Sequence, residues 1–233
     1  MNIVIPFRNT CGQEELKMCI KLIRKNLKMK YNHIYVIGDE CDIIDVVNIN
    51  VKEQKYNKWL DSNFLVEKYI NEIKEPFILF NDDFFLTKEI FDIPYYFYGT
   101  LKNRTLTTYI INERTNKIQL SSYGLNIQAF LNQYGDYENY EVHIPIIVKY
   151  PNIMRKAIIF CNLDDCPALK RSLYVKLCEK EGLIKLDKYK LEHDVKFNEP
   201  LRVIQYPFFS LTDNIEFKAF KEKLEEIADA REE

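Results

Sequence analysis

The amino-acid sequence predicts an open α/β fold, with a mixed central sheet flanked by helices in one compact domain of 233 residues. Two short apolar runs separated by an amphipathic segment give the order strand, helix, strand of a right-handed parallel crossover. A third apolar run, FILF, lacks alternation, as expected for a strand covered on both faces. No repeat, low-complexity tract or long Pro/Gly/Ser linker divides the chain into separate domains.

The elements of the first 90 residues follow from their patterns. Asn2–Phe7 is typical of a buried strand that opens into a loop. A helix is expected from Glu14 to about Lys28, because apolar residues recur at helical spacing after an acidic first turn. His33–Gly38 predicts a second strand, Ser62–Glu72 a second helix, and residues 76–80 a central strand. The first helix also carries a cationic stripe, which fits a solvated face or an anion site: Lys17, Lys21, Arg24, Lys25 and Lys28.

Beyond about residue 90 the pattern predicts strands of mixed direction and a lid or acceptor region. Four strand-like runs are Tyr95–Tyr98, Leu106–Asn112, Ile144–Tyr150 and Ala157–Phe160. Pro167 and Gly182 bracket a helix over about 167–181. Asp213 followed by Glu216 is a capping box that begins the last helix.

Composition and charge exclude several classes of protein. Because 33 Lys and Arg residues nearly balance 35 Asp and Glu residues, we expect no broad basic face for nonspecific nucleic-acid binding. Six cysteines without a CxxC pair, and only three histidines, argue against a disulfide scaffold or a zinc site. No run approaches the roughly 18 apolar residues that cross a bilayer, and no signal-peptide pattern is present. We therefore expect a cytoplasmic protein without a membrane span.

The stretch FILFNDDFFL, residues 77–86, places polar residues at the end of the most apolar strand. Two adjacent carboxylates, Asp82 and Asp83, are costly there unless a cation is present. The carboxyl ends of strands in open α/β sheets face the ligand crevice, and hard oxygen ligands suit Mg²⁺ or Mn²⁺ shared with a substrate diphosphate. The alternative is that Asn81, Asp82 and Asp83 form a turn or a cap.

The ordered set IVIPFRN, VIGDE, WLDSNFLVEKYI and FILFNDD resembles the nucleotide-sugar-binding half of GT-A glycosyltransferases, whose DXD motif holds a divalent metal. The resemblance covers residues 1–90 and leaves residues 91–233 as an acceptor-binding half with the C-terminal helix. Here the motif reads Asn81, Asp82, Asp83, with an amide in place of the first acid. The resemblance implies Asp83 as a metal ligand, Asn81 and Asp82 at the donor with Asp82 also a catalytic group, and a nucleotide-sugar donor. The Asn/Ile/Lys/Tyr-rich composition indicates an AT-rich genome and leaves a glycan and a hydroxylated DNA base open as acceptors.

Three short islands are also similar to Stealth-family sugar-phosphate transferases: NDDFFL, HIP at 143–145 and RSLY at 171–174. Both resemblances imply a nucleotide-activated sugar, a diphosphate and a divalent metal. They differ in whether a sugar or a sugar phosphate is transferred. A noncatalytic nucleotide-sugar-binding protein is a third hypothesis, for which Asn81 in place of an acid is the feature to test.

Four polar residues of the first half complete the predicted nucleotide pocket. Arg8 and Asp39 follow the first two strands, so we expect them at the carboxyl edge of the sheet. There Arg8 would pair with a phosphate and Asp39 would accept from the base or ribose, with ordinary loop solvation as the alternative. The GT-A pattern adds Asn63 and Lys58, the latter as a cation beside the diphosphate.

Three residues of the second half are further candidates. His143 is either a packed histidine on an apolar strand or an acceptor-binding or general acid/base group. By the GT-A resemblance, His193 is the third metal ligand. Arg171 is either a diphosphate clamp or a member of a surface salt bridge.

Overall fold

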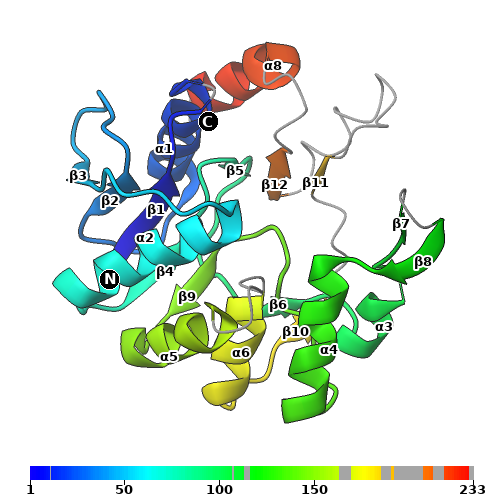
Figure 1. Cartoon of the computed structure of the whole chain (residues 1–233). Coiled ribbons are helices and arrows are strands. Elements are labelled where there is room, and N and C mark those ends of the chain that lie inside the picture. Colours follow the sequence, from blue (N-terminus) through cyan, green and yellow to red (C-terminus); the bar gives the residue numbers. More distant parts are fainter. Residues whose placement is uncertain are drawn as a thin grey trace.

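The computed structural model describes residues 1–10, 12–106, 108–112, 116–162, 169–184, 190–191, 207–211 and 218–230. A five-stranded sheet forms its centre, in the order β3 (Val47–Asn50), β2 (Ile34–Gly38), β1 (Asn2–Phe7), β4 (Phe77–Leu79) and β9 (Ile146–Val148) (Figure 1). The first four strands are parallel, and β9 is antiparallel to β4. The mixed α/β sheet that the sequence predicts is confirmed. The division of the chain at residue 90 stays a prediction.

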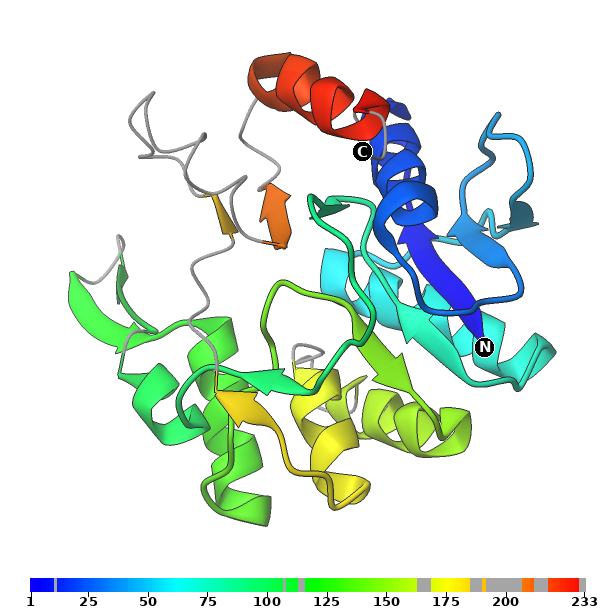
Figure 2. The same ribbon diagram turned by 180° about the vertical axis from the view of Figure 1, so that it is seen from behind.

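Helices cover both faces of this sheet. On the face turned to the viewer in Figure 2 lie α1 (Glu14–Asn26) and α8 (Lys218–Asp229), and on the face turned to the viewer in Figure 1 lie α2 (Lys58–Glu72) and α5 (Pro151–Asn162). Every residue of β1 is buried. Ile3 and Ile5 belong to the core shared with α1, and Val4 belongs to the core shared with α2. This two-sided burial is why the strand reads as a continuous apolar run.

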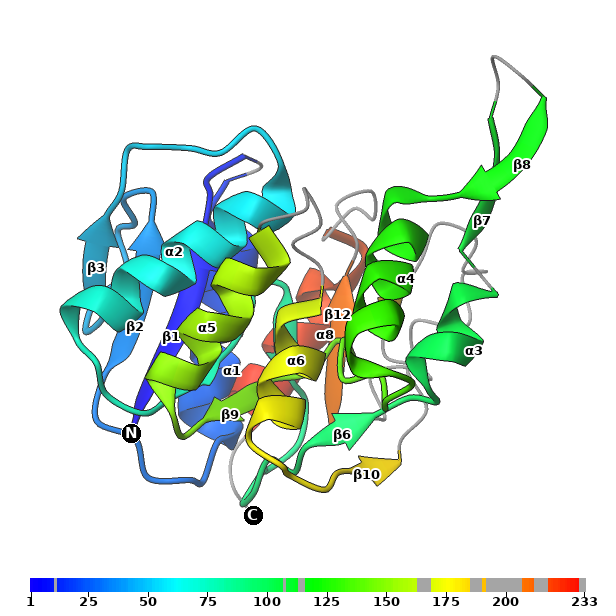
Figure 3. The same ribbon diagram turned by 60° about the horizontal axis from the view of Figure 1, so that its bottom comes forward.

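Shorter elements surround the central sheet in the described part of the chain. Strand β5 (Phe84–Leu86) pairs antiparallel with β12 (Phe208–Leu211), which is parallel to β11 (Lys190–Leu191). Strand β6 (Tyr96–Phe97) pairs with β10 (Leu183–Ile184), and β7 (Tyr109–Asn112) forms a hairpin with β8 (Lys117–Leu120). The remaining helices are α3 (Leu101–Thr105), α4 (Ser122–Tyr134) and α6 (Lys170–Leu177) (Figure 3).

One expected strand, Ala157–Phe160, is wrong, because these residues lie within α5. Periodicity over so short an apolar run does not separate a strand from a buried helix. The pattern over residues 151–162 distinguishes the two. The helix begins at Pro151, in the first-turn position that proline favours. Its buried residues recur at helical spacing along one face, namely Met154, Ala157, Ile158 and Cys161.

The second helix, expected from about Ser62, begins already at Lys58. Asn57 is the N-cap, and its side-chain oxygen accepts a hydrogen bond from the Trp59 N–H at 2.8 Å. A capping asparagine satisfies one of the otherwise unpaired N–H groups of the first turn, so the cap fixes where the helix starts.

The helix predicted over about 167–181 is α6, described over Lys170–Leu177. Pro167 and the capping box of Asp213 and Glu216 lie outside the described residues. Among the helices that the structure describes, none combines the length and the apolar character needed to cross a bilayer.

The cationic stripe of α1 packs against the C-terminal helix. Lys21 pairs with Asp229 at 2.6 Å, and the ammonium of Lys25 donates to the Ile227 carbonyl at 2.6 Å in the last turn of α8. A cation at a helix C-terminus satisfies carbonyl groups that have no partner within the helix. Part of the stripe therefore docks α8, while Lys17, Lys21 and Arg24 remain exposed, as expected for a solvated face.

Candidate functional site

The residues Asn81 to Phe84 form a tight turn, here called the acidic turn, at the carboxyl end of β4. The Phe84 N–H donates to the Asn81 carbonyl at 3.3 Å, which places Asp82 and Asp83 at the two central positions of the turn. Asp82 and Asp83 are half-buried as residues, although Oδ1 of Asp83 is a buried atom, and Phe80 and Phe84 on either side are buried. The turn that the sequence offers as the alternative is present, and it lies at the carboxyl end of a central strand. The metal-binding role of the two acids stays a prediction.

The acidic turn packs on α1 through Cys19. The Cys19 thiol donates to the Asn81 carbonyl, with sulfur and oxygen 3.6 Å apart. Burial raises the pKa of Cys19 well above its usual value, and the carboxylates of Asp82 and Asp83 raise it further. The two acids therefore impose a negative potential that reaches the core beneath them, and a cation at the turn would be stabilised by it.

Arg171 joins three segments that are far apart in the sequence. Its Nη1 donates to the carbonyls of Val142 and Ile144 at 2.7 and 2.6 Å, on either side of His143. Its guanidinium carbon lies 5.5 Å from the ring centroid of Phe84, within cation–π range. The side chain is buried, so it is no surface salt bridge. The islands NDDFFL, HIP and RSLY thus meet at one point, and Arg171 holds the backbone around His143.

The start of α6 is capped from the same segment. Oε1 of Glu141 accepts hydrogen bonds from the backbone N–H groups of Arg171 at 2.8 Å and Ser172 at 2.9 Å. Burial raises the pKa of Glu141 above its usual value, although the positive charges of Arg171 and Lys170 act in the opposite direction. Burial also lowers the pKa of the neighbouring Lys170. The segment of His143 is therefore tied to α6 by both side-chain and backbone groups.

The C-terminal part of the chain comes beside the acidic turn through β12. In the register of β5 and β12, Ser210 lies opposite Phe84. Strand β11, next to β12, ends at Leu191. His193, the predicted third metal ligand, lies outside the described residues.

Arg8, at the end of β1, uses all five of its N–H donors inside the protein. Nε and Nη2 donate to the two carboxylate oxygens of Asp61 at 2.7 and 3.0 Å. Nη1 donates to Asp39 at 2.9 Å and to the Val51 carbonyl at 2.6 Å, and Nη2 donates to the Glu53 carbonyl at 2.6 Å. A phosphate contact of the predicted kind would require Arg8 to break one of these bonds. We call this group the Arg8 network.

The charges of the Arg8 network stabilise one another. Hydrogen bonding to Asp61 raises the pKa of Arg8, even though burial acts in the opposite direction. Burial raises the pKa of Asp61, but Arg8 and the Lys55 N–H outweigh burial and hold it below its usual value. Asp39 also accepts from the Asn9 N–H at 2.9 Å, and its side chain keeps 30% of its surface exposed. Among the side chains of Arg8, Asp39 and Asp61, that of Asp39 is the most exposed, and its nucleotide contact stays a prediction.

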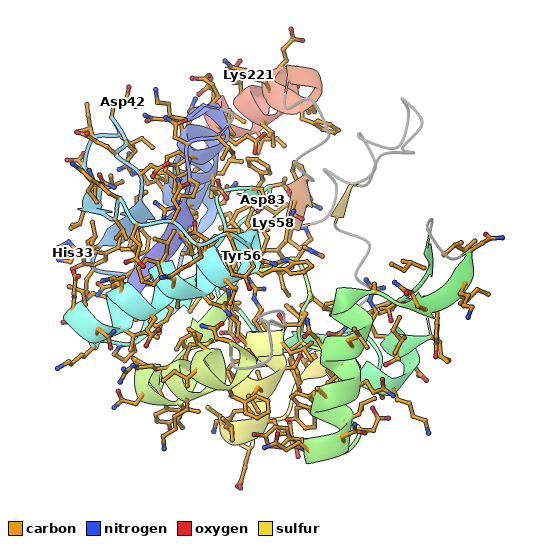
Figure 4. All side chains as sticks on the ribbon, viewed as in Figure 1. His33, Asp42, Tyr56, Lys58, Asp83 and Lys221 are labelled. Atoms are coloured by element: carbon orange, nitrogen blue, oxygen red, sulfur yellow. The ribbon has the colours of Figure 1, made fainter. Side chains whose placement is uncertain are left out.

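The two residues predicted from α2 differ in exposure. Lys58 is exposed in the first turn of α2, and Figure 4 labels its side chain together with that of Asp83. Asn63 has no exposed surface. Its amide accepts from Lys170 at 2.7 Å and donates to Asn162 at 3.0 Å. Asn63 therefore joins three helices, and its predicted nucleotide contact is not available in this structure.

Two acids of these networks, Asp61 and Glu141, were not predicted from the sequence. Asp61 carried a usable signal, because it lies four residues before Leu65 on the buried face of α2. A charged residue on an apolar helical stripe requires a partner. Glu141 carried no comparable signal, because its partners are backbone groups of a helix thirty residues away.

An open pocket of about 460 Å³ lies away from the acidic turn, at the amino ends of β2 and β3. Its lining includes Arg24, Tyr31, His33 and Asp45. Ligands of open α/β sheets bind at the opposite, carboxyl ends of the strands, so this pocket does not compete with the acidic turn as the candidate site.

Comparison with known proteins shows distant likeness to solved structures. No protein-family model and no curated protein sequence matches the chain. Among solved structures, it is similar to the apo-form glycosyltransferase GlyE of Streptococcus pneumoniae TIGR4, with a TM-score of 0.44 and 8% sequence identity. The match covers 99% of this chain and 60% of that chain. A likeness this distant does not transfer an activity to the chain.

Proposed function

We propose that this chain transfers a sugar from a nucleotide-sugar donor to an acceptor, either a glycan or a hydroxylated DNA base, at the acidic turn. The supporting observation is the position of two adjacent carboxylates, Asp82 and Asp83, where the central strand β4 ends. Open α/β sheets bind their ligands at such strand ends. A donor diphosphate bound there needs compensating positive charge.

The oxygens of the acidic turn fit Mg²⁺ or Mn²⁺. Such ions commonly take one or two carboxylates and complete their shell with water and substrate phosphates. Within the described ranges, no group of three or more His, Cys, Asp or Glu residues is arranged to hold a metal ion. In the proposal, the ion is therefore coordinated by the acidic turn and the substrate together. In the proposal Asp83 is the ligand with Asp82 beside it, and His193 is a further ligand. The bound ion would neutralise the leaving nucleoside diphosphate.

Other residues of the chain bind the donor and move a proton. Asp39 and Asn81 hold the donor, and the exposed Lys58 offsets the charge of its diphosphate. His143, held between two carbonyls bound by Arg171, takes the proton of the acceptor hydroxyl. As the bond from the acceptor oxygen to the sugar forms, the bond from the sugar to phosphate oxygen breaks, and its electron pair leaves with the nucleoside diphosphate.

A second candidate function is transfer of a sugar phosphate. It is favoured by the convergence of Phe84, His143 and Arg171, which brings together the three islands similar to the Stealth family. In that reaction the acceptor oxygen attacks phosphorus, and a nucleoside monophosphate leaves. The two candidates share the acidic turn and differ in the nucleotide released.

The test combines binding with product analysis. A thermal-shift panel of nucleotide sugars, with and without Mn²⁺, should reveal a donor that stabilises the native chain only with metal. Asp83→Asn should abolish that shift, whereas Asp92→Asn, an exposed acid on the same segment, should preserve it. Release of nucleoside diphosphate identifies sugar transfer, and nucleoside monophosphate identifies sugar-phosphate transfer. Metal-dependent binding without nucleotide release identifies a noncatalytic binding protein, and an equal shift in Asp83→Asn contradicts the proposed site.

A further inference from the structure

Two large aromatic side chains are exposed where α2 begins. Tyr56, in the loop before the helix, keeps 82% of its surface exposed, and Trp59, in the first turn, keeps 38%. Asn57 between them is the N-cap and accepts from the Trp59 N–H at 2.8 Å, so the cap holds the backbone that carries both rings. We call Tyr56 and Trp59 the aromatic rim.

Trp59 and its neighbour Lys58 lie on the face of α2 that packs on the sheet. They stand at helical spacing before buried residues of that face, namely Asp61, Asn63, Leu65, Val66, Tyr69 and Ile70. Trp59 and Lys58 are nevertheless exposed. A residue on the packed face of a helix stays exposed where the helix extends past the layer beneath it, so the first turn of α2 extends past the sheet.

The contact between Asp61 and Arg8 shows which edge of the sheet α2 extends past. Arg8 directly follows β1, and its Nε donates to Asp61 at 2.7 Å. Because α2 packs on β1 and β2 and begins at their carboxyl ends (Figure 3), the residues before Asp61 lie beyond those ends. Strand β4, next to β1, ends in the acidic turn. The aromatic rim and the acidic turn therefore share the carboxyl edge of the sheet.

The charges at this edge discriminate between the ligands that an aromatic surface can bind. A nucleic-acid strand requires cations along its phosphates, whereas a sugar ring requires an apolar face for its C–H groups and acceptors for its hydroxyls. Exposed or half-buried carboxylates follow β2, β3 and β4, namely Asp39, Glu40, Asp42, Glu53, Asp82 and Asp83. The cations after β1 and β3 and at the start of α2 are fewer, namely Arg8, Lys52, Lys55 and Lys58.

Two of these cations are engaged within the protein. Arg8 donates to the groups of the Arg8 network, and Lys55 forms an ion pair with Glu53. Lys170, at the start of α6, lies beside Glu141, whose charge opposes its own. In the described part of the chain, this edge therefore offers a nucleic-acid strand more carboxylates than cations. A neutral glycan matches both the aromatic rim and the carboxylate acceptors.

We propose that the aromatic rim binds a sugar ring of a neutral glycan, with the ring on Trp59 and Tyr56 beside it, and that this glycan is the acceptor. Hydroxyl groups of the glycan donate to the carboxylates of the same edge. The acceptor role rests on the proposed function, which leaves a glycan and a hydroxylated DNA base open. The binding of the glycan does not depend on it.

Fluorescence titration of the full chain tests the proposal, because Trp59 is the only tryptophan of the sequence. The probes are neutral hexasaccharides of glucose, galactose, mannose, rhamnose and N-acetylglucosamine, a thymidine oligonucleotide, and UDP with Mn²⁺. We expect a saturable change of emission with at least one hexasaccharide and none with the oligonucleotide. No response to any hexasaccharide overturns the proposal. A response to the oligonucleotide or to UDP in its place also overturns it and assigns the aromatic rim to a nucleobase.

Calorimetry of variants shows whether the hexasaccharide binds at the aromatic rim. Tyr56→Ala, at a highly exposed position, should weaken binding at least fivefold, and Trp59→Ala at least tenfold. Tyr150→Ala is the matched control and should bind as the native protein does. Tyr150 is 49% exposed and follows β9, whose Val148 lies opposite Phe77 at the amino end of β4, so it lies at the other edge of the sheet. Equal binding by the native protein and Tyr56→Ala overturns the proposal.

Asp83→Asn separates this inference from the proposed function. The variant should lose metal-dependent donor binding and keep its affinity for the hexasaccharide. If the native chain binds the hexasaccharide at the aromatic rim but releases no nucleotide from any nucleotide sugar, the proposed function fails and the glycan site stands. If nucleotide is released while Tyr56→Ala and Trp59→Ala keep the native KM for the acceptor, the aromatic rim fails and the proposed function stands.

Discussion

The Arg8 network and the acidic turn stand at the carboxyl ends of neighbouring strands, β1 and β4, yet their charges are arranged differently. Arg8 lies between two carboxylates and uses every donor within the chain, so its charge is compensated where it is buried. In the acidic turn, Asp82 and Asp83 are adjacent like charges in a half-buried position. The first arrangement serves stability, and the second is typical of a site that binds a cation.

Asp61 of the Arg8 network and Glu141 at the start of α6 differ in the direction of their pKa shifts. In the Arg8 network, Arg8 and the Lys55 N–H outweigh burial and lower the pKa of Asp61. At the start of α6, burial outweighs the neighbouring cations and raises the pKa of Glu141. A polar cluster at a strand end is therefore not by itself evidence of chemistry.

The largest effect is expected at Asp83. Asp83→Asn should lower the rate of nucleotide release about 10³-fold, on the scale of removing one electrostatic group from a transfer site. The melting temperature should stay the same or rise, because one of two adjacent like charges is removed. Steady-state kinetics and thermal unfolding measure the two quantities. A variant that keeps its rate would show that the acidic turn is not the site of transfer.

Arg8 should affect stability rather than binding. Arg8→Lys keeps the charge but loses the planar five-donor arrangement, so we expect a loss of about 3 kcal/mol in the free energy of unfolding. Urea unfolding measures this loss. Nucleotide affinity at a temperature where the variant is folded should change less than threefold. If Arg8→Lys bound the nucleotide much more weakly but kept native stability, Arg8 would have the phosphate-binding role predicted from the sequence.

His143 should affect turnover alone. His143→Gln should lower kcat by roughly 10²-fold, the lower end of the effect of losing a general acid/base, and leave metal and donor affinity unchanged. Arg171→Lys should lower kcat by a smaller factor, because a lysine has no planar pair of donors for the carbonyls of Val142 and Ile144. Equal kcat in native protein and His143→Gln would reduce His143 to a packed histidine.

The smallest effects are expected in the pH dependence of stability, with opposite signs for Asp61 and Glu141. Asp61 has a lowered pKa, so its contribution is present above its unfolded value of about 3.9 and is lost as pH falls through the lower folded value. In Asp61→Asn, the free energy of unfolding should therefore fall less steeply as the pH is lowered. Urea unfolding at a series of pH values measures this dependence. If the variant lost stability in acid as steeply as the native protein, other acids would control the pH dependence.

Glu141 has a raised pKa, so its contribution is present below its unfolded value of about 4.3 and is lost as pH rises through the higher folded value. Glu141→Gln keeps an oxygen acceptor for the N–H groups of Arg171 and Ser172 but has no carboxyl group to titrate. In the same unfolding series, its free energy of unfolding should therefore decline less toward neutral pH than that of the native protein. A steeper decline in Glu141→Gln would contradict the assignment of burial as the dominant cause.

The candidate site was predictable as far as local patterns reach. The end of β4 and the acids that follow it were visible, because an apolar run and the next residues are neighbours in the chain. The convergence of His143 and Arg171 was visible only as separate islands, since no local pattern states which backbone carbonyls an arginine 27 to 29 positions away will bind.

The sequence by itself determined the first strand, helix and strand, the central strand, and the acids at its end, because burial periodicity and turn chemistry act over a few residues. Only the tertiary structure decided that Asp61 neutralises Arg8, that Asn63 is buried, and that Lys25 caps α8. These outcomes join residues from 53 to 202 positions apart. They depend on which surfaces the packed helices bring together, and a charged group inside such a contact must find its partner there.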